Sequence, residues 1–160
     1  MTDFATADLT DEFADRLRIV TPGFMDFGGS PRFCGPIETV QAYEDNTFVR
    51  QTLETPGEGR VLVVDGAGSM KCALLGDRLG ELAVKNSWVG VIVHGAIRDK
   101  KALSNMPIGV KALGTHPLKS HKAGRGGRGM ELFFHGTRFQ PGNFIYCDED
   151  GMVLAEEKLI

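Results

Sequence analysis

The sequence predicts an α/β fold, and three features support this class. Two apolar, β-branched runs at residues 60–65 and 89–97 have the length and composition of buried strands. The stretch between them, residues 79–88, is helix-like. From residue 130 onward, short strand candidates alternate with Gly, Pro and Asp turns, which favours a β-rich, antiparallel part. With 160 residues, the chain is expected to form a single domain over 1–160.

The N-terminal third is predicted to contain two helices and one strand. Residues 6–20 carry apolar side chains at a spacing near 3.6, which predicts an opening helix. These side chains are Leu9, Phe13, Leu17 and Val20. Residues 25–36 are dense in Gly and Pro and predict a turn-rich loop, after which residues 37–43 alternate like a strand. A second helix is expected over residues 46–54.

Each of the two buried runs ends in a segment of a different kind. Gly66-Ala-Gly-Ser69 follows the first run, and Arg98-Asp99 follows the second. Open α/β sheets bind ligands where the carboxyl ends of strands meet loops and helix N-termini, so both segments are candidate site positions. A tight turn explains the glycines of the first segment equally well, and that segment lacks the spacing of a nucleotide-binding loop.

Composition excludes several classes of protein. A hydrophobic fraction of 42% with a net charge of -3 is that of a globular protein, not of a basic protein that coats nucleic acid. No apolar run approaches the ~20 residues that cross a bilayer, and the first residues are acidic, so a cytoplasmic location without membrane contact is expected. Cys34, Cys72 and Cys147 are widely separated, which favours buried, reduced thiols.

Residues 119–129 form a basic, glycine-rich loop that is expected to be mobile. Its four Lys and Arg side chains could contact phosphate or RNA. No aromatic residue is interleaved to stack a base, and the whole chain is acidic. A solvated loop is therefore the favoured interpretation, and direct nucleic-acid binding is not expected.

The strongest chemical signal is the combination of Gly76-Asp77-Arg78-Leu79 with Arg98-Asp99. Because a helical pattern starts just after Gly76, the amides of Asp77 to Leu79 are expected to point unpaired at an anion. An Arg fork matches a carboxylate, while an Asp oxygen suits Mg²⁺ or Mn²⁺. The pair of motifs predicts a small oxyacid held beside a divalent ion.

Structural explanations exist for each of these residues. Asp77 could serve only to cap the helix, and Arg98-Asp99 could form local salt bridges at a strand end. His94, inside an apolar run, is expected to pack in the core and not to act as a ligand. The residues alone leave these alternatives open.

A series of motifs resembles a known family. They are Phe27-Gly-Gly, Phe33-Cys-Gly-Pro-Ile, Glu44-Asp-Asn46, the segments 59–69 and 95–99, the segment 108–117 and Pro141-Gly-Asn. Together they resemble the regulator of ribonuclease activity A family, which is related to 4-hydroxy-4-methyl-2-oxoglutarate aldolases. The resemblance keeps order and spacing from about residue 6 to the C-terminus.

The resemblance implies a swivelling β/β/α domain of the phosphohistidine-domain type that assembles as a ring-shaped homotrimer. Aldolase members use a divalent cation, Mg²⁺ or Mn²⁺, and no Schiff-base lysine. Carried over position by position, the amides of Gly76 to Leu79 would receive the substrate carboxylate. Arg98 would bind substrate and the developing enolate, and Asp99 would hold the metal, partly through water.

The implied reaction is cleavage of 4-hydroxy-4-methyl-2-oxoglutarate to two pyruvates, with decarboxylation of oxaloacetate as a sibling reaction. Cleavage requires a base for the C4 hydroxyl proton, whereas decarboxylation does not. Aldolases carry an acidic residue where this chain has Ala102, and the family usually carries one where this chain has Asn143. The sequence does not clearly supply the base.

The alternative function is that of a non-enzymatic regulator that binds and masks ribonuclease E. The short chain and residues 24–29 resemble that branch, whereas the retained Asp99 favours a competent enzyme site. A menaquinone-pathway methyltransferase has also been attached to such sequences. It is not favoured, because no methyl-donor glycine loop with a downstream acidic residue is present.

Overall fold

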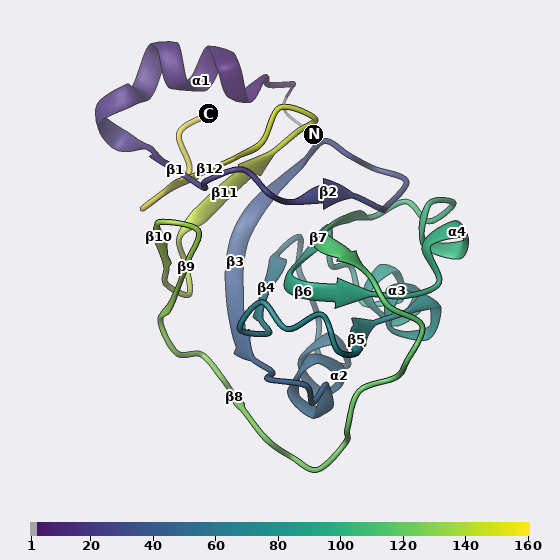
Figure 1. Cartoon of the computed structure of the whole chain (residues 1–160). Helices are drawn as coiled ribbons and strands as arrows, with labels where there is room; N and C mark the ends of the chain where they lie inside the picture. Colours follow the sequence, from purple (N-terminus) through teal and green to yellow (C-terminus); the bar gives the residue numbers. More distant parts are fainter. Residues whose placement is uncertain (1–2) are drawn as a thin grey trace.

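The computed structural model describes residues 3–160, and a mixed β-sheet runs through its centre (Figure 1). Four helices accompany the sheet: α1 (Thr6–Phe13), α2 (Thr47–Leu53), α3 (Asp77–Lys85) and α4 (Lys100–Leu103). The main strands, in chain order, are β3 (Phe33–Gln41), β4 (Val61–Asp65), β5 (Ala73–Leu75), β6 (Gly90–Ile97), β7 (Gly109–Thr115), β11 (Phe144–Cys147) and β12 (Met152–Ala155). Three short strands complete the sheet: β1 (Arg18–Ile19), β2 (Met25–Asp26) and β8 (Gly127–Arg128).

The sheet has a parallel half and an antiparallel half that share strand β3. β3, β4, β6 and β7 are parallel neighbours, and β5 pairs with β6 in the same direction. On the other side of β3 lie β11, β12 and β1, all antiparallel. The antiparallel C-terminal part expected from the sequence is therefore confirmed, and β9 (Leu132–Phe134) and β10 (Thr137–Phe139) add a separate hairpin.

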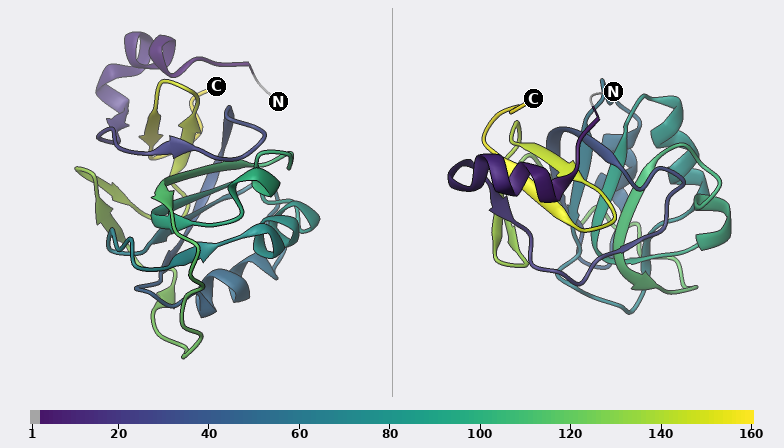
Figure 2. Two further views of the ribbon diagram at one scale, coloured as in Figure 1. Left: turned by 45° about the vertical axis from the view of Figure 1, so that its right-hand side comes forward. Right: turned by 90° about the horizontal axis from the view of Figure 1, so that it is seen from above.

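Both faces of the parallel half are covered, which explains why its strands are apolar throughout. On one face, Leu62 and Val64 of β4 pack with α2 and α3. On the other face, Val61 and Val63 pack with Phe134 of the β9–β10 hairpin and its neighbours. A smaller cluster lies under α1. The views in Figures 1 and 2 place α1 with both chain ends at one end of the molecule, and α2 with the β8 segment at the other.

The predicted strands 60–65 and 89–97 and the helix 46–54 are confirmed as β4, β6 and α2. The predicted helix 6–20 is too long. It ends in a 3₁₀ turn at Ala14–Arg16, because the backbone of Arg18 and Ile19 pairs with β12 instead. The helix expected at 79–88 runs over Asp77–Lys85, and Ser87 then takes a left-handed conformation with φ 65.

The predicted loop 25–36 is also wrong at both ends. Met25 and Asp26 form β2 against β7, and β3 starts at Phe33, where Cys34 and Pro36 pair with β11. The segment 119–129 is not a free loop, since β8 within it pairs with Val40 and Gln41 of β3. No helix among residues 3–160 is long and apolar enough to cross a membrane.

Candidate active site at the start of α3

The two predicted site motifs lie side by side because the strands before them are parallel neighbours. Leu75 at the end of β5 pairs with Ile97 at the end of β6. The Arg98 amide donates to the Leu75 carbonyl at 2.9 Å, so Gly76 and Arg98 leave the same sheet edge together. The expectation that both motifs lie at the ends of regular elements is confirmed. Strand β5, which the sequence did not reveal, makes this neighbourhood.

Asp99 contacts the start of α3 directly. Its Oδ2 accepts a hydrogen bond of 3.0 Å from the backbone amide of Asp77. Asp99 has φ 58 and ψ 40, a left-handed conformation that turns its side chain back at the cap of α4. A Cβ atom on Gly76 would lie 2.6 Å from the same Oδ2, so any other residue at this position would force the Asp99 carboxylate to shift.

The start of α3 is less open to an anion than the sequence predicted. The Asp77 amide binds Asp99, and the Arg78 amide binds the carboxylate of Asp77 at 2.8 Å. Within residues 3–160 the Leu79 amide makes no hydrogen bond. Of the amides of Asp77 to Leu79, one therefore lacks a partner, and a second loses its partner when Asp99 turns away.

Arg98 and Asp99 do not form the local salt bridges that remained an alternative. No ion pair of either residue exists within the part of the chain from residue 3 onward. Arg98 makes one long hydrogen bond of 3.4 Å, to the Pro117 carbonyl. A guanidinium and a carboxylate thus stand next to each other with most of their bonding capacity unused.

These residues line a cavity of about 560 Å³ between α2, α3 and the segment after β7. Its lining carries five basic side chains, Arg50, Arg78, Arg98, Lys119 and Lys122. Two carboxylates, Asp77 and Asp99, face them, so the lining has a formal charge of 5 − 2 = +3, against -3 for the whole chain. A cavity of this sign concentrates anions.

Four polar lining residues were missed by the sequence analysis. Asn46 and Arg50 come from the start of α2, and Lys119 and Lys122 come from the segment that was interpreted as a solvated loop. The available signal was the basic character of residues 119–129, but its placement depends on long-range contacts. The backbone amide of Asn46 donates to the His121 carbonyl at 3.2 Å, which brings that segment to the cavity.

The donor set suits a hard divalent cation only in an open site. No group of three or more His, Cys, Asp or Glu side chains in residues 3–160 could hold a metal ion. Asp99 is exposed and offers one carboxylate, whose Oδ1 makes no hydrogen bond within the described chain. Mg²⁺ commonly keeps several waters and takes the remaining oxygens from its substrate, so a site with one carboxylate fits it.

The remaining candidates have structural roles. His94 stacks on Phe134 with ring centroids 4.5 Å apart, and its Nδ1 lies 3.0 Å from Asp65 Oδ1. The amides of Gly66 and Gly68 both donate to the His94 carbonyl, so the glycine turn closes on its own sheet. The expectation of a packed histidine is confirmed, and the turn presents neither of these two amides to a ligand.

The fold and the cavity define a mixed α/β protein with a cationic pocket at the carboxyl ends of its parallel strands. The chain belongs to the RraA-like family, described as Aldolase/RraA, whose model matches residues 6–154. This shows the family that the sequence motifs indicated.

Two similar relatives share one name. A protein of Laribacter hongkongensis named "Putative 4-hydroxy-4-methyl-2-oxoglutarate aldolase" is 56% identical over 158 residues, which cover 99% of both chains. A protein of Aromatoleum aromaticum with the same name is 55% identical over 158 residues, also covering 99% of each.

Two solved structures with the same fold carry different names. The RNA-processing inhibitor RraA from Thermus thermophilis has a TM-score of 0.95 and 42% identity, covering 99% of this chain and 96% of that one. The S-adenosylmethionine: 2-dimethylmenaquinone methyltransferase from Geobacillus kaustophilus has a TM-score of 0.94 and 49% identity, with coverages of 98% and 97%. The fold is therefore shared among proteins named for three activities, and the site must decide between them.

Proposed function

We propose that this protein is a divalent-metal-dependent lyase that releases pyruvate from 2-keto dicarboxylic acids. Its substrates are oxaloacetate, which it decarboxylates, and 4-hydroxy-4-methyl-2-oxoglutarate, which it cleaves. The observation that carries this proposal is the unpaired Arg98 and Asp99 beside the start of α3, inside a cavity whose lining has a charge of +3. The names of the aldolase relatives support the same reaction class.

In this proposal, some site residues bind the substrate and one binds the metal. Asp99, together with waters, would hold Mg²⁺ or Mn²⁺, and the bound ion supplies Lewis-acid polarisation of a 2-keto oxygen. The Leu79 amide and the Arg98 guanidinium would bind the substrate carboxylate, with Gly76 to Arg78 shaping the approach. Arg98 also lies where it can stabilise the negative charge that develops on the enolate oxygen.

Decarboxylation of oxaloacetate needs no further protein group. The bond between C3 and C4 breaks, its electron pair forms the enolate of pyruvate, and carbon dioxide leaves. The enolate then takes a proton from water and becomes pyruvate. Retro-aldol cleavage also requires a base for the C4 hydroxyl proton. The cavity's own carboxylates are Asp77, bound to the Arg78 amide, and Asp99, so decarboxylation is the faster reaction in our proposal.

The family resemblance supports further parts of the proposal. We infer a homotrimer of swivelling β/β/α domains in the phosphohistidine-domain class, located in the cytoplasm. Sites near subunit interfaces would give the cavity additional groups from a second copy, including a base. Size-exclusion chromatography with light scattering measures the oligomer directly, and a monomer that turns over substrate would contradict this part.

The deciding experiment measures pyruvate release from oxaloacetate and from 4-hydroxy-4-methyl-2-oxoglutarate, with Mg²⁺ or Mn²⁺ and with EDTA. We expect metal-dependent turnover that EDTA abolishes and that Asp99→Ala lowers strongly. Turnover that is unchanged by EDTA or by Asp99→Ala would exclude the proposed role of the metal.

A second candidate is a non-enzymatic regulator that binds ribonuclease E. The close structural match to an RNA-processing inhibitor is the observation in its favour. A pull-down with purified ribonuclease E tests it, and absence of association in a preparation with turnover would remove it. We do not propose methyl transfer, because the glycine turn at 66–69 binds its own sheet and the sequence lacks a methyl-donor loop.

A further inference from the structure

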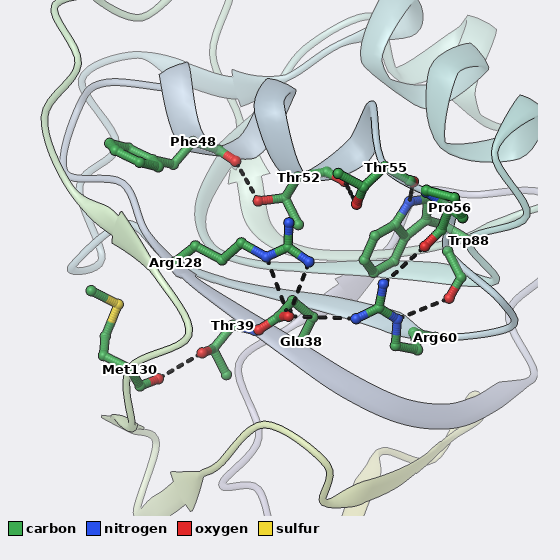
Figure 3. Close-up of polar contacts among 11 residues, drawn as sticks. Glu38, Thr39, Phe48, Thr52, Thr55, Pro56, Arg60, Trp88, Arg128 and Met130 are labelled. Atoms are coloured by element: carbon green, nitrogen blue, oxygen red, sulfur yellow. Dashed lines mark hydrogen bonds and ion pairs between the residues drawn. The ribbon is translucent and has the colours of Figure 1, made fainter.

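The segment 118–128 is fixed to the protein along most of its length. At its start, the Ala73 amide donates to the Leu118 carbonyl at 2.8 Å. At its end, Arg128 binds Glu38 Oε2 through Nη2 at 3.2 Å, and Arg60 approaches the same oxygen at 3.4 Å, as Figure 3 shows. Lys119 and Lys122, which line the cavity, lie between these two ends.

Asp45 holds the middle of this segment. Its side chain is fully buried, with 0% of the residue surface exposed. Oδ1 accepts hydrogen bonds from Thr47, at 2.6 Å from the hydroxyl and 3.0 Å from the amide. Oδ2 accepts from the amides of Ala123 at 2.7 Å and Arg125 at 3.4 Å. One carboxylate therefore joins the start of α2 to the residue that directly follows Lys122.

The neighbouring contacts reinforce this junction. The Thr47 hydroxyl, which donates to Asp45, accepts a hydrogen bond of 3.1 Å from the Gly124 amide. The His121 amide donates to the Glu44 carbonyl at 3.0 Å. Every bond from the segment to Asp45 comes from backbone amides, so Asp45 fixes the path of the chain and leaves the lysine side chains free.

We propose that Asp45 is a positioning residue that holds Lys119 and Lys122 over the cavity, so that they meet the carboxylate of the substrate that lies away from the keto group. This inference rests on the proposed function for its substrate class. The proposal assigns two roles within one cavity. Arg98 and Asp99 face the keto end of the substrate, and Lys119 and Lys122, held by Asp45, bind the second carboxylate.

The first test uses trypsin, because the segment carries cleavage sites at its Lys and Arg residues. We expect these sites to be protected in the parent protein and cut at least about 10-fold faster in Asp45→Asn, since an amide cannot accept from all four donors. Asp148→Asn is the matched control. Asp148 is also buried and accepts four hydrogen bonds, but it holds Thr6 and the 148–151 turn, far along the chain from the cavity. Equal protection in Asp45→Asn and the parent would overturn the proposal.

The second test measures ligand affinity by calorimetry in the presence of Mg²⁺. 2-Oxoglutarate has a second carboxylate and pyruvate has none. We expect Asp45→Asn to weaken 2-oxoglutarate about 10-fold and pyruvate less than about 2-fold, which corresponds to the loss of one charge interaction. For turnover of oxaloacetate, KM should rise by a similar factor with kcat nearly unchanged. A merely structural role would weaken both ligands alike or neither, and either result overturns the proposal.

The two proposals can fail separately. If the parent protein binds neither keto acid, the proposed function is wrong, and the role of Asp45 in reading substrate falls with it even when trypsin shows a released segment. If the parent binds both ligands and Asp45→Asn keeps the ratio of their affinities, the proposed function stands and the positioning role is wrong.

Discussion

Substituting Gly76 by Ala should disable the site and leave the fold intact. The added methyl group would lie 2.6 Å from Asp99 Oδ2 and 3.3 Å from Arg98 Cγ, whereas ordinary contacts begin at 3.4 Å. To reach ordinary contact distance, the Asp99 Oδ2 atom would therefore move by about 0.8 Å. This movement breaks its bond to the Asp77 amide and displaces both reactive side chains.

The expected magnitudes follow from these distances. A misplacement of about 1 Å in a reacting group costs about 100-fold in rate, or about 2.7 kcal/mol in activation free energy. The backbone of Gly76 has φ -139 and ψ -164, which alanine adopts without strain. The lost hydrogen bond of an exposed carboxylate, about 1 kcal/mol, is offset by the entropy that alanine removes from the unfolded chain, about 0.4–1 kcal/mol. The melting temperature should then change by less than about 4 °C.

The assay is steady-state decarboxylation of oxaloacetate with Mg²⁺, together with thermal unfolding of the same samples. Gly114→Ala is the matched control, since its methyl group would meet only the terminal methyl of Met70, a flexible and exposed side chain. We expect the control to keep its activity. The reasoning is refuted by a Gly76→Ala variant with activity within about 3-fold of the parent, or by one that loses activity and melting temperature together.

Three further changes test other parts of the structure. Asp99→Asn should lower turnover about 100-fold with little change in stability, because asparagine also tolerates the left-handed backbone; equal turnover would contradict metal binding. Burial raises the pKa of Asp45, but its hydrogen bonds outweigh this and lower it from 3.8 to about 2. The lowered pKa of Asp45 contributes about 2 kcal/mol to the free energy of unfolding above about pH 4, and this contribution is lost as the pH falls through 2. The difference in unfolding free energy between the parent and Asp45→Asn should therefore narrow at low pH. A difference that stays constant with pH would contradict this role of Asp45. Asn143→Asp would give Arg18, 2.9 Å away, an ionic partner and should stabilise the fold by about 0.5–1 kcal/mol in urea unfolding at neutral pH, an effect that salt weakens. No gain at low salt would count against it.

The sequence revealed the parts of the fold in which local pattern and tertiary packing agree. The runs at 60–65 and 89–97 are buried on both faces, so their apolar composition identified strands β4 and β6. The helix predicted at 6–20 was too long at its C-terminal end, because the pairing of Arg18 and Ile19 with β12 outweighs the helical spacing of Leu17 and Val20. Strand β5 was missed because three residues carry no periodic signal.

The sequence likewise predicted only some of the residues of the candidate site. Arg98 and Asp99 follow a strong strand signal, so their place at a sheet edge could be inferred. Lys119 and Lys122 could not be placed, since their position depends on hydrogen bonds to residues more than seventy positions earlier. The sequence also did not show that the Asp77 amide is occupied, because its partner Asp99 lies 22 residues later in the chain and is brought to it by folding.

The left-handed backbone of Asp99 limits which residues can succeed it in evolution. Glycine, asparagine and aspartate adopt φ 58 at little cost, whereas β-branched and bulky side chains are strained there. A descendant that no longer needs the carboxylate can therefore drift to Asn or Gly without disturbing the cap of α4. Such a lineage would keep the bend and the cavity while losing the chemistry, and a single inspection of this position would separate the two kinds of descendant.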